Sequence, residues 1–212
     1  MDSILKHQRV INVDRWINEN TASFVPPVCN KLMYSDQLKV MFVGGPNTRK
    51  DFHLEDGEEL FFQFKGDMQL PIVEHGKHMV IDIKAGEIFL LPGRIPHSPQ
   101  RFENSVGLVI ERKRAQFERD GLRYYVDDSC QQVLWERWFY CTDLGKDLLP
   151  VIKEYMASNA YRTRQPTGES FQGEPAAFKP NSTITVRRPF RLLDWLAANK
   201  DEITQVEFID SN

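Results

Sequence analysis

Two stretches of the chain hold the side chains that could do chemistry. The first, residues 44–59, reads GGPNTRKDFHLEDGEE, and the second, residues 92–101, reads PGRIPHSPQR. Together they supply the histidines His53 and His97, the carboxylate of Glu59, and the guanidinium groups of Arg49 and Arg101. Imidazoles and carboxylates are common metal ligands, and guanidinium groups pair with carboxylates and phosphates. The set is therefore suited to a metal ion beside a bound anion.

The order of the three possible ligands also matters. His53 and Glu59 flank a predicted turn, and His97 lies in a loop after a later predicted strand, so an antiparallel barrel can bring all three to one inner face. Two neutral imidazoles and one carboxylate on one face of a cation leave the opposite face open, as in non-haem iron(II) oxygenases. One histidine near a turn is more often a simple hydrogen-bonding residue, so the prediction depends on the combination.

The elements that must position these residues are mostly short strands. Apolar runs bounded by Gly, Pro, Asp and Asn predict strands at residues 31–34, 38–43, 60–65, 68–73, 79–83, 88–91 and 105–112. Two aromatic-rich segments that follow them, LRYYVDD and QQVLWERWFYC, predict two more strands. This spacing is typical of an antiparallel sandwich or barrel, and therefore of an all-β fold.

A few helices are expected around the strands. Helical spacing of Val13, Trp16 and Ile17 predicts a helix over residues 12–20 that packs on a sheet, and residues 144–156 predict a longer one that covers the barrel. Prolines, glycines and few apolar residues mark 162–189 as a linker. A helix near Pro189 is then predicted to bury Leu192, Trp195 and Leu196, and QVEFID begins a strand pattern near the end.

Composition narrows the class of protein. The 212 residues carry a net charge of -3 with a pI near 6.0, so we expect no nucleic-acid partner. We find no signal peptide and no run of apolar residues long enough for a membrane span, and we expect a cytosolic protein without a membrane partner. The three cysteines, Cys29, Cys130 and Cys141, are far apart and are expected to be reduced and buried.

The remaining charged and imidazole side chains are interpreted as solvated. His75 and His78 flank a predicted hairpin tip, His7 precedes the first helix, and the run 111–114 is expected to face solvent except for Glu111. The four aromatic residues at 135 and 138–140 are expected in the core or at an interface.

Longer strings indicate a family. PPVCNKLM, VMFVGGPNTRKDFHLEDGEELFFQFKGDM, GEIFLLPGRIPHSPQRF and VGLVIERKR together resemble the animal-type 3-hydroxyanthranilate 3,4-dioxygenase family, over most of residues 10–160. That family belongs to the cupin superfamily, so the resemblance implies a jelly-roll antiparallel barrel with a few flanking helices. Where many cupins have a second histidine after the first, this chain has Glu55. The resemblance therefore implies three ligands rather than four, provided that Glu55 faces away.

The resemblance also implies a reaction and residue roles. His53, Glu59 and His97 would hold Fe²⁺, Arg49 and Arg101 would pair with the substrate carboxylate, Glu111 would take part in proton transfer, and Asn30 would be a polar contact. The implied reaction joins 3-hydroxyanthranilate and dioxygen to give 2-amino-3-carboxymuconate semialdehyde, the precursor of quinolinate and NAD in the kynurenine pathway of tryptophan catabolism.

The end of the chain leaves an alternative open. Animal-type members continue into a second cupin-like domain, so the resemblance implies a catalytic domain at 1–160, a linker at 161–181, and the start of a truncated C-terminal domain at 182–212. We expect a monomer or weak self-association. The alternative function is a non-catalytic truncated cupin that binds a metal or an aromatic acid, and a sugar isomerase is disfavoured by the paired arginines.

Overall fold

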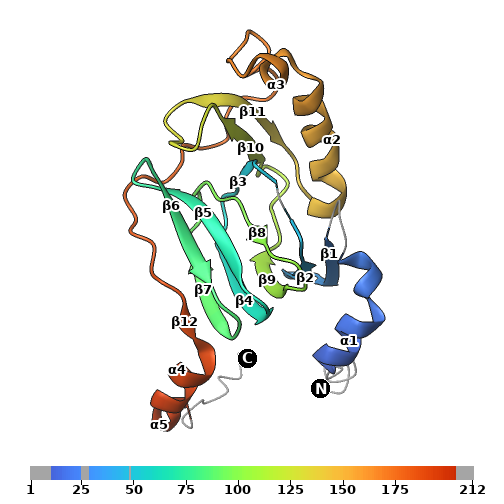
Figure 1. Cartoon of the computed structure of the whole chain (residues 1–212), viewed down its shortest axis with the longest axis vertical. Helices are drawn as coiled ribbons and strands as arrows, with labels where there is room; N and C mark the ends of the chain where they lie inside the picture. Colours follow the sequence, from blue (N-terminus) through green and yellow to red (C-terminus); the bar gives the residue numbers. More distant parts are fainter. Residues whose placement is uncertain (1–10, 25–28, 48, 204–212) are drawn as a thin grey trace.

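The computed structural model describes residues 11–24, 29–47 and 49–203, and most of the ordered elements in these ranges are strands (Figure 1). In chain order they are α1 (Val13–Glu19), the 3₁₀ turn η2 (Thr21–Ser23), β1 (Asn30–Ser35), β2 (Leu38–Gly44), β3 (Phe52–Leu54), β4 (Glu59–Lys65), β5 (Met68–Glu74), β6 (Lys77–Ile83), β7 (Glu87–Leu91), β8 (Gln100–Arg101), β9 (Val106–Arg112), β10 (Asp120–Tyr125), β11 (Val133–Phe139), α2 (Leu144–Ala157), α3 (Asn159–Thr163), β12 (Phe190–Arg191), α4 (Leu192–Ala198) and α5 (Lys200–Ile203). Among the described helices, none is both long and apolar enough to cross a membrane.

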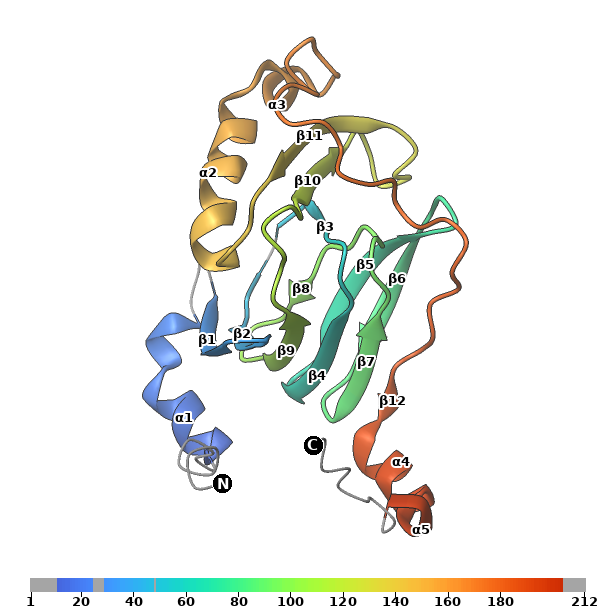
Figure 2. The ribbon, with the colours of Figure 1, turned by 180° about the vertical axis from the view of Figure 1, so that it is seen from behind.

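The strands form two facing layers (Figures 1 and 2). The larger sheet has the order β1-β2-β9-β4-β7-β12, and each neighbouring pair in it is antiparallel. The opposite layer contains β6-β5-β8 and β11-β10-β3, which His97 connects through backbone bridges to Ile72 and to His53. Strands distant in sequence are therefore neighbours in space, and the predicted antiparallel all-β fold with a few flanking helices is confirmed.

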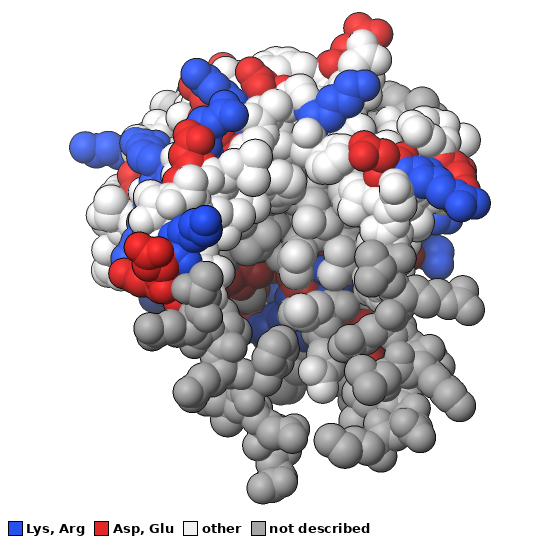
Figure 3. All heavy atoms as spheres, turned by 90° about the horizontal axis from the view of Figure 1, so that it is seen from below, with Lys and Arg blue, Asp and Glu red and all other residues white. Residues whose placement is uncertain are grey.

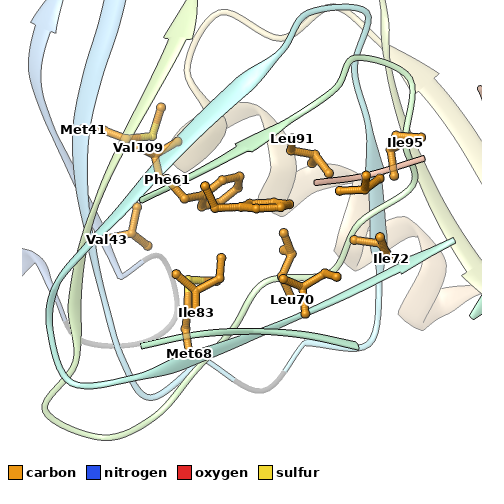
Figure 4. Packing of buried hydrophobic residues seen from close by; sticks show 13 residues of the cluster. Met41, Val43, Phe61, Met68, Leu70, Ile72, Ile83, Leu91, Ile95 and Val109 are labelled. Carbon is orange, nitrogen blue, oxygen red and sulfur yellow. The ribbon is translucent and has the colours of Figure 1, made fainter. Parts of the chain in front are cut away.

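The main core fills the space between the layers. Along β4, Phe61 is buried between half-buried Leu60 and Phe62, because successive strand side chains point to opposite faces. Buried side chains from both layers point toward one another (Figure 4). The cluster comprises Met41, Val43, Phe61, Met68, Leu70, Ile72, Ile81, Ile83, Phe89, Leu91, Ile95, Val109 and Val186. This cluster holds the two layers together and so supports the loops that carry the two motifs.

A second core fixes α2 on β10 and β11. Leu148 and Tyr155 of the helix pack with Leu122 and Trp135 of the strands, and Tyr155 stacks on Tyr124 at a ring-centroid distance of 3.5 Å. This confirms the predicted covering helix and the burial of the aromatic strands, although Met156 and Tyr140 are 54% and 40% exposed. The three cysteines are free and buried, also as predicted.

The first helix, α1, packs on the larger sheet as predicted. The Asn12 side chain accepts a hydrogen bond from the Arg15 backbone N–H and caps the helix. Trp16 contacts Phe42 of β2 with ring centroids 5.3 Å apart. The seven-residue helix therefore lies against β2 of the larger sheet.

The segment predicted as a linker is instead partly bound to the barrel. We call residues 178–191 the strap, because they run along the outside of β6 and β7 (Figure 2). Val186 is buried in the main core, and its backbone N–H donates to Glu74 Oε1 at 2.5 Å. His75, predicted to be solvated, is exposed but contacts the carbonyl of Ser182 at 2.8 Å and the hydroxyl of Thr185 at 3.1 Å. The hairpin tip is thus a docking point for the strap.

The prediction of a buried side on the following helix is wrong. Trp195 and Leu196 of α4 are 47% and 37% exposed, and Leu192 is only half-buried. The helix extends below the barrel (Figure 1), so no sheet covers this face within the described ranges. The predicted strand at QVEFID lies outside the described residues. The division of the chain at residues 160 and 181 stays a prediction.

Candidate metal and substrate site

Three buried side chains form a group that could hold a metal ion. One ligand atom from each of His53, Glu59 and His97 lies within 4.8 Å of the others. His53 is on β3, Glu59 is the first residue of β4, and His97 is in the loop between β7 and β8. The two motifs identified in the sequence therefore meet at one point of the barrel.

Backbone hydrogen bonds bring the two motifs together. The His53 N–H donates to the His97 carbonyl at 2.8 Å, and the His97 N–H donates to the His53 carbonyl at 3.1 Å. Further along, the Arg94 N–H donates to the carbonyl of Glu55 at 2.8 Å. Because these bonds join main chains, they fix the two loops before any ligand binds.

Each imidazole has one nitrogen engaged outside the group. His97 Nδ1 lies 2.9 Å from the carbonyl oxygen of Ile95, which can only accept, so Nδ1 carries the proton. His53 Nε2 lies 2.7 Å from the carboxylate of Asp120, so the same reasoning places a proton there. Such partners orient metal-binding histidines and leave the second nitrogen free as a donor to a cation.

The electrostatics of the group favour bound positive charge. Burial alone would raise the pKa of Glu59, but the neighbouring His97 and His53 lower it well below its usual range. Burial would likewise lower the pKa of His97, whereas Glu59, with its Oε2 3.2 Å from Nε2, raises it. The carboxylate therefore favours a proton or a cation on the His97 ring. Two imidazoles and one carboxylate at these distances fit a divalent transition metal.

Two arginines lie beside this group. Arg101 is 4% exposed, and its Nε and Nη2 atoms have no hydrogen-bond partner among the described residues. Burial lowers the pKa of Arg101 to about 10. Arg49 Nε lies 3.2 Å from Asp51 Oδ1 but likewise makes no hydrogen bond among the described residues. Buried guanidinium N–H groups without partners are suited to an incoming carboxylate.

The backbone around the arginines is closely packed. The Gln100 side-chain amide donates to the Arg49 carbonyl at 2.6 Å, and the Asn47 N–H donates to the Arg101 carbonyl at 3.0 Å. A Cβ at Gly45 would lie 2.0 Å from the carbonyl oxygen of Phe102. Glycine therefore allows the first motif to lie directly on the turn that follows the second.

The ligand group and the arginines open into one pocket with an empty volume of about 690 Å³, its mouth included. Its polar wall includes Asn30, Asn47, Arg49, His53, Glu59, His97 and Arg101, and its apolar wall includes Met41, Val43, Phe61, Val109, Leu144, Leu148, Leu149 and Ile152. Seen from below, the molecule is hollowed, with atoms of acidic and basic side chains inside the hollow (Figure 3). A pocket lined by both polar and apolar side chains suits a flat aromatic acid.

Glu111 and Asn30 lie at the border of the pocket. Asn30 lines both the large pocket and a smaller cavity beside it, and Glu111 lines the smaller cavity together with Lys39. Burial raises the pKa of Glu111, although Arg114 partly offsets this effect. The Arg114 Nη1 atom donates to Glu111 Oε1 at 2.6 Å. Glu111 is thus close to the ligand group but held by a neighbouring cation.

Three buried residues near the site have positions that the sequence does not predict. The expectation of three ligands assumed that Glu55 faces away from the metal. Glu55 is buried, and its Oε2 accepts a hydrogen bond from Arg114 Nη2 at 2.6 Å. Arg114, predicted to be solvated, is 7% exposed, so that prediction is wrong. Asp120 contacts both Arg114 and His53. The only sequence signal was the position of Glu55 after His53, since Arg114 follows a charged run and Asp120 begins a strand.

Comparisons with known proteins agree with the geometry. Residues 5–156 match the family described as 3-hydroxyanthranilic acid dioxygenase. Curated proteins named 3-hydroxyanthranilate 3,4-dioxygenase are 54% identical over 196 residues in Rattus norvegicus and 56% identical over 197 residues in Xenopus laevis. Each of these two alignments covers 92% of this chain and 68% of the relative. The part of the chain that matches the family, residues 5–156, contains the ligand group and both arginines.

Proposed function

The chain belongs to the 3-hydroxyanthranilic acid dioxygenase family, and on that premise we propose that it opens the ring of 3-hydroxyanthranilate with dioxygen. His53, Glu59 and His97 would hold an iron(II) ion. One observation carries the proposal: the three metal-type donors and two guanidinium groups with unpaired N–H groups line the same pocket. The ion supplies the redox chemistry that joins dioxygen to the ring when it is bound.

The arginines have the task of binding and orienting the substrate. Arg49 and Arg101 would receive the ring carboxylate, because a planar guanidinium can donate two parallel hydrogen bonds to it. Arg101 is buried beside Glu59 and so would fix the carboxylate at a set position relative to the ligand group. The hydroxyl and amino groups of the ring would then face His53 and His97. Positioning of this kind lowers the entropic cost of the reaction.

Glu111 would act on the proton of the substrate. It is buried, lies opposite Glu59 in the pairing of β9 with β4, and has a raised pKa because of burial. A carboxylate of this kind is a stronger base than one in water. We therefore propose that Glu111 accepts a proton from the hydroxyl or amino group, with Asn30 as a polar contact between the two cavities.

The apolar wall would keep water from the ring. The pocket lining includes four apolar side chains of α2, which are Leu144, Leu148, Leu149 and Ile152. The reaction would break the bond between ring carbons 3 and 4, add both oxygen atoms, and give 2-amino-3-carboxymuconate semialdehyde. This product would cyclise to quinolinate without the enzyme, which would place the reaction in the kynurenine route to NAD, in the cytosol.

Anaerobic loading with iron(II), followed by air and 3-hydroxyanthranilate, tests the proposal. We expect one iron per chain by elemental analysis and formation of the semialdehyde, measured by its absorbance. A chain that binds one iron and the substrate but forms no product would instead be a non-catalytic binding protein. Failure to bind iron would overturn the assignment of His53, Glu59 and His97.

A further inference from the structure

Arg114 lies at the centre of a buried charge cluster behind the proposed ligand group. It is in the loop between β9 and β10, and it donates from Nε to Asp120 Oδ1 at 2.7 Å. Its Nη1 donates to Glu111 Oε1 at 2.6 Å, and its Nη2 donates to Glu55 Oε2 at 2.6 Å. Arg114 and these three carboxylates are all less than a tenth exposed. Nη2 also donates to Glu111 Oε2 at 3.2 Å, so the three guanidinium nitrogens together hold three carboxylates, Glu111 through two of them.

These carboxylates contact different parts of the proposed site. Asp120 uses its other oxygen, Oδ2, to contact His53 Nε2 at 2.7 Å. Glu111 is the residue to which we assign the proton transfer. Glu55 has an oxygen within 4.8 Å of oxygens of both Glu59 and Glu111. One cation thus connects β9, β10 and the turn between β3 and β4.

We propose that Arg114 is a positioning residue that sets the orientation of His53 through Asp120 and holds Glu111 in place. The inference rests on the proposed function, because it assumes that His53 binds the metal ion. A carboxylate that accepts from a histidine fixes its ring and makes the opposite nitrogen a stronger ligand. The planar guanidinium presents its donors on three separate nitrogens in a rigid fork, a geometry that the single ammonium nitrogen of lysine does not reproduce.

The composition of the cluster supports a role beyond stability. Desolvating one cation and three carboxylates is costly, and well-packed apolar side chains of similar volume often stabilise a fold as much or more. The second nearby cation, Lys39, has its Nζ 3.9 Å from Glu111 Oε1 and 2.5 Å from the Thr142 carbonyl. The orientation given to His53 and Glu111 is therefore the feature that an apolar replacement would not reproduce.

Binding of Co²⁺ to the full chain tests the inference, with wild type, Arg114→Met, Asp120→Asn and the control Arg123→Met. Arg123 lies on the same strand as Asp120, and its Nε donates a hydrogen bond to Glu136 Oε2 at 2.6 Å. We expect Arg114→Met and Asp120→Asn to bind Co²⁺ about 10- to 100-fold more weakly by chelator competition. Their visible absorption bands should shift, whereas Arg123→Met should keep the affinity and spectrum of wild type.

The double variant Arg114→Met with Asp120→Asn distinguishes action through Asp120 from an independent effect. We expect its Co²⁺ affinity to be close to that of Arg114→Met, because residues acting in one path are not additive. Folded single variants with wild-type affinity and spectrum would overturn the inference. If Arg114→Met does not fold, Asp120→Asn alone decides. Failure of wild type to bind Co²⁺ would instead refute the proposed metal site itself.

Discussion

Replacement of Arg101 by methionine should weaken substrate binding without a loss of fold stability. Arg101 is buried, and its Nε and Nη2 atoms have no partner among the described residues. The free protein therefore holds a charge that water would solvate better. Methionine is of similar length, carries no charge, and adapts to irregular space.

The size of the stability effect follows from the pKa of Arg101. Burial lowers this pKa from the usual arginine value to about 10, and each unit corresponds to about 1.4 kcal/mol, so the charge destabilises the fold by roughly 3 kcal/mol. Because the folded-state pKa is the lower one, the cost is complete below about pH 10 and is lost as the pH rises from there toward the usual arginine pKa. At pH 7 we expect the free energy of unfolding of Arg101→Met to equal or exceed that of wild type.

The effect on binding should have the opposite sign. A hydrogen bond to a charged group contributes about 1.5–3 kcal/mol, and Arg101 can donate two to a carboxylate. Their loss amounts to about 3–6 kcal/mol, which is at least about 100-fold in affinity. Substrate titration under anaerobic conditions measures this loss, and urea denaturation measures the stability of the same protein.

Arg123→Met is the matched control for Arg101→Met. Arg123 is paired with Glu136. Burial would lower the pKa of Arg123, but the Glu136 carboxylate raises it. Removal of the Arg123 guanidinium should therefore destabilise the fold by about 3–5 kcal/mol. If Arg101→Met loses as much stability as Arg123→Met and still binds the substrate normally, the assignment of Arg101 as an unpaired carboxylate receptor is wrong.

Three further predictions concern the metal, the substrate and the strap. Glu59→Ala should lose bound iron by elemental analysis, while Glu58→Ala, at an exposed neighbouring position, should keep it. Arg49→Ala should keep its iron but raise KM, about 10-fold or more for one lost charge-assisted hydrogen bond. Loss of iron in that variant would contradict the separate roles. Val186→Ala should lower the free energy of unfolding by about 2 kcal/mol, because two buried methyl groups are removed, whereas Ile184→Ala, at a 39% exposed position, should change it little in urea denaturation.

The longer strands could be predicted because their side chains alternate, whereas the shortest could not. β3 and β8 are only 3 and 2 residues long, so neither shows a period. His53 and Arg101 nevertheless lie on these two strands. Their residue types and the family resemblance, rather than a strand pattern, indicated the site. The structure supplies the missing link, which is the backbone pairing of His53 with His97.

Buried charge was the feature that the sequence described least well. Arg114 belongs to a run of charged residues, and such runs usually face solvent. Its burial depends on Glu55, Glu111 and Asp120, which come from separate segments and meet only in the folded chain. The pattern of residues in a single sequence contains no information on such contacts between distant segments. The same limit explains the exposed face of α4, since amphipathic spacing predicts that a face is apolar but not that a partner covers it.

The strap has a consequence for how this barrel can be exchanged between proteins. The family match ends at residue 156, whereas the barrel core takes one of its buried side chains from Val186. A chimera that joined residues 1–160 to a foreign continuation would lack that side chain and leave the Glu74 carboxylate without the Val186 N–H. A recombined protein that keeps this barrel should therefore also keep the strap, because the two form one structural unit.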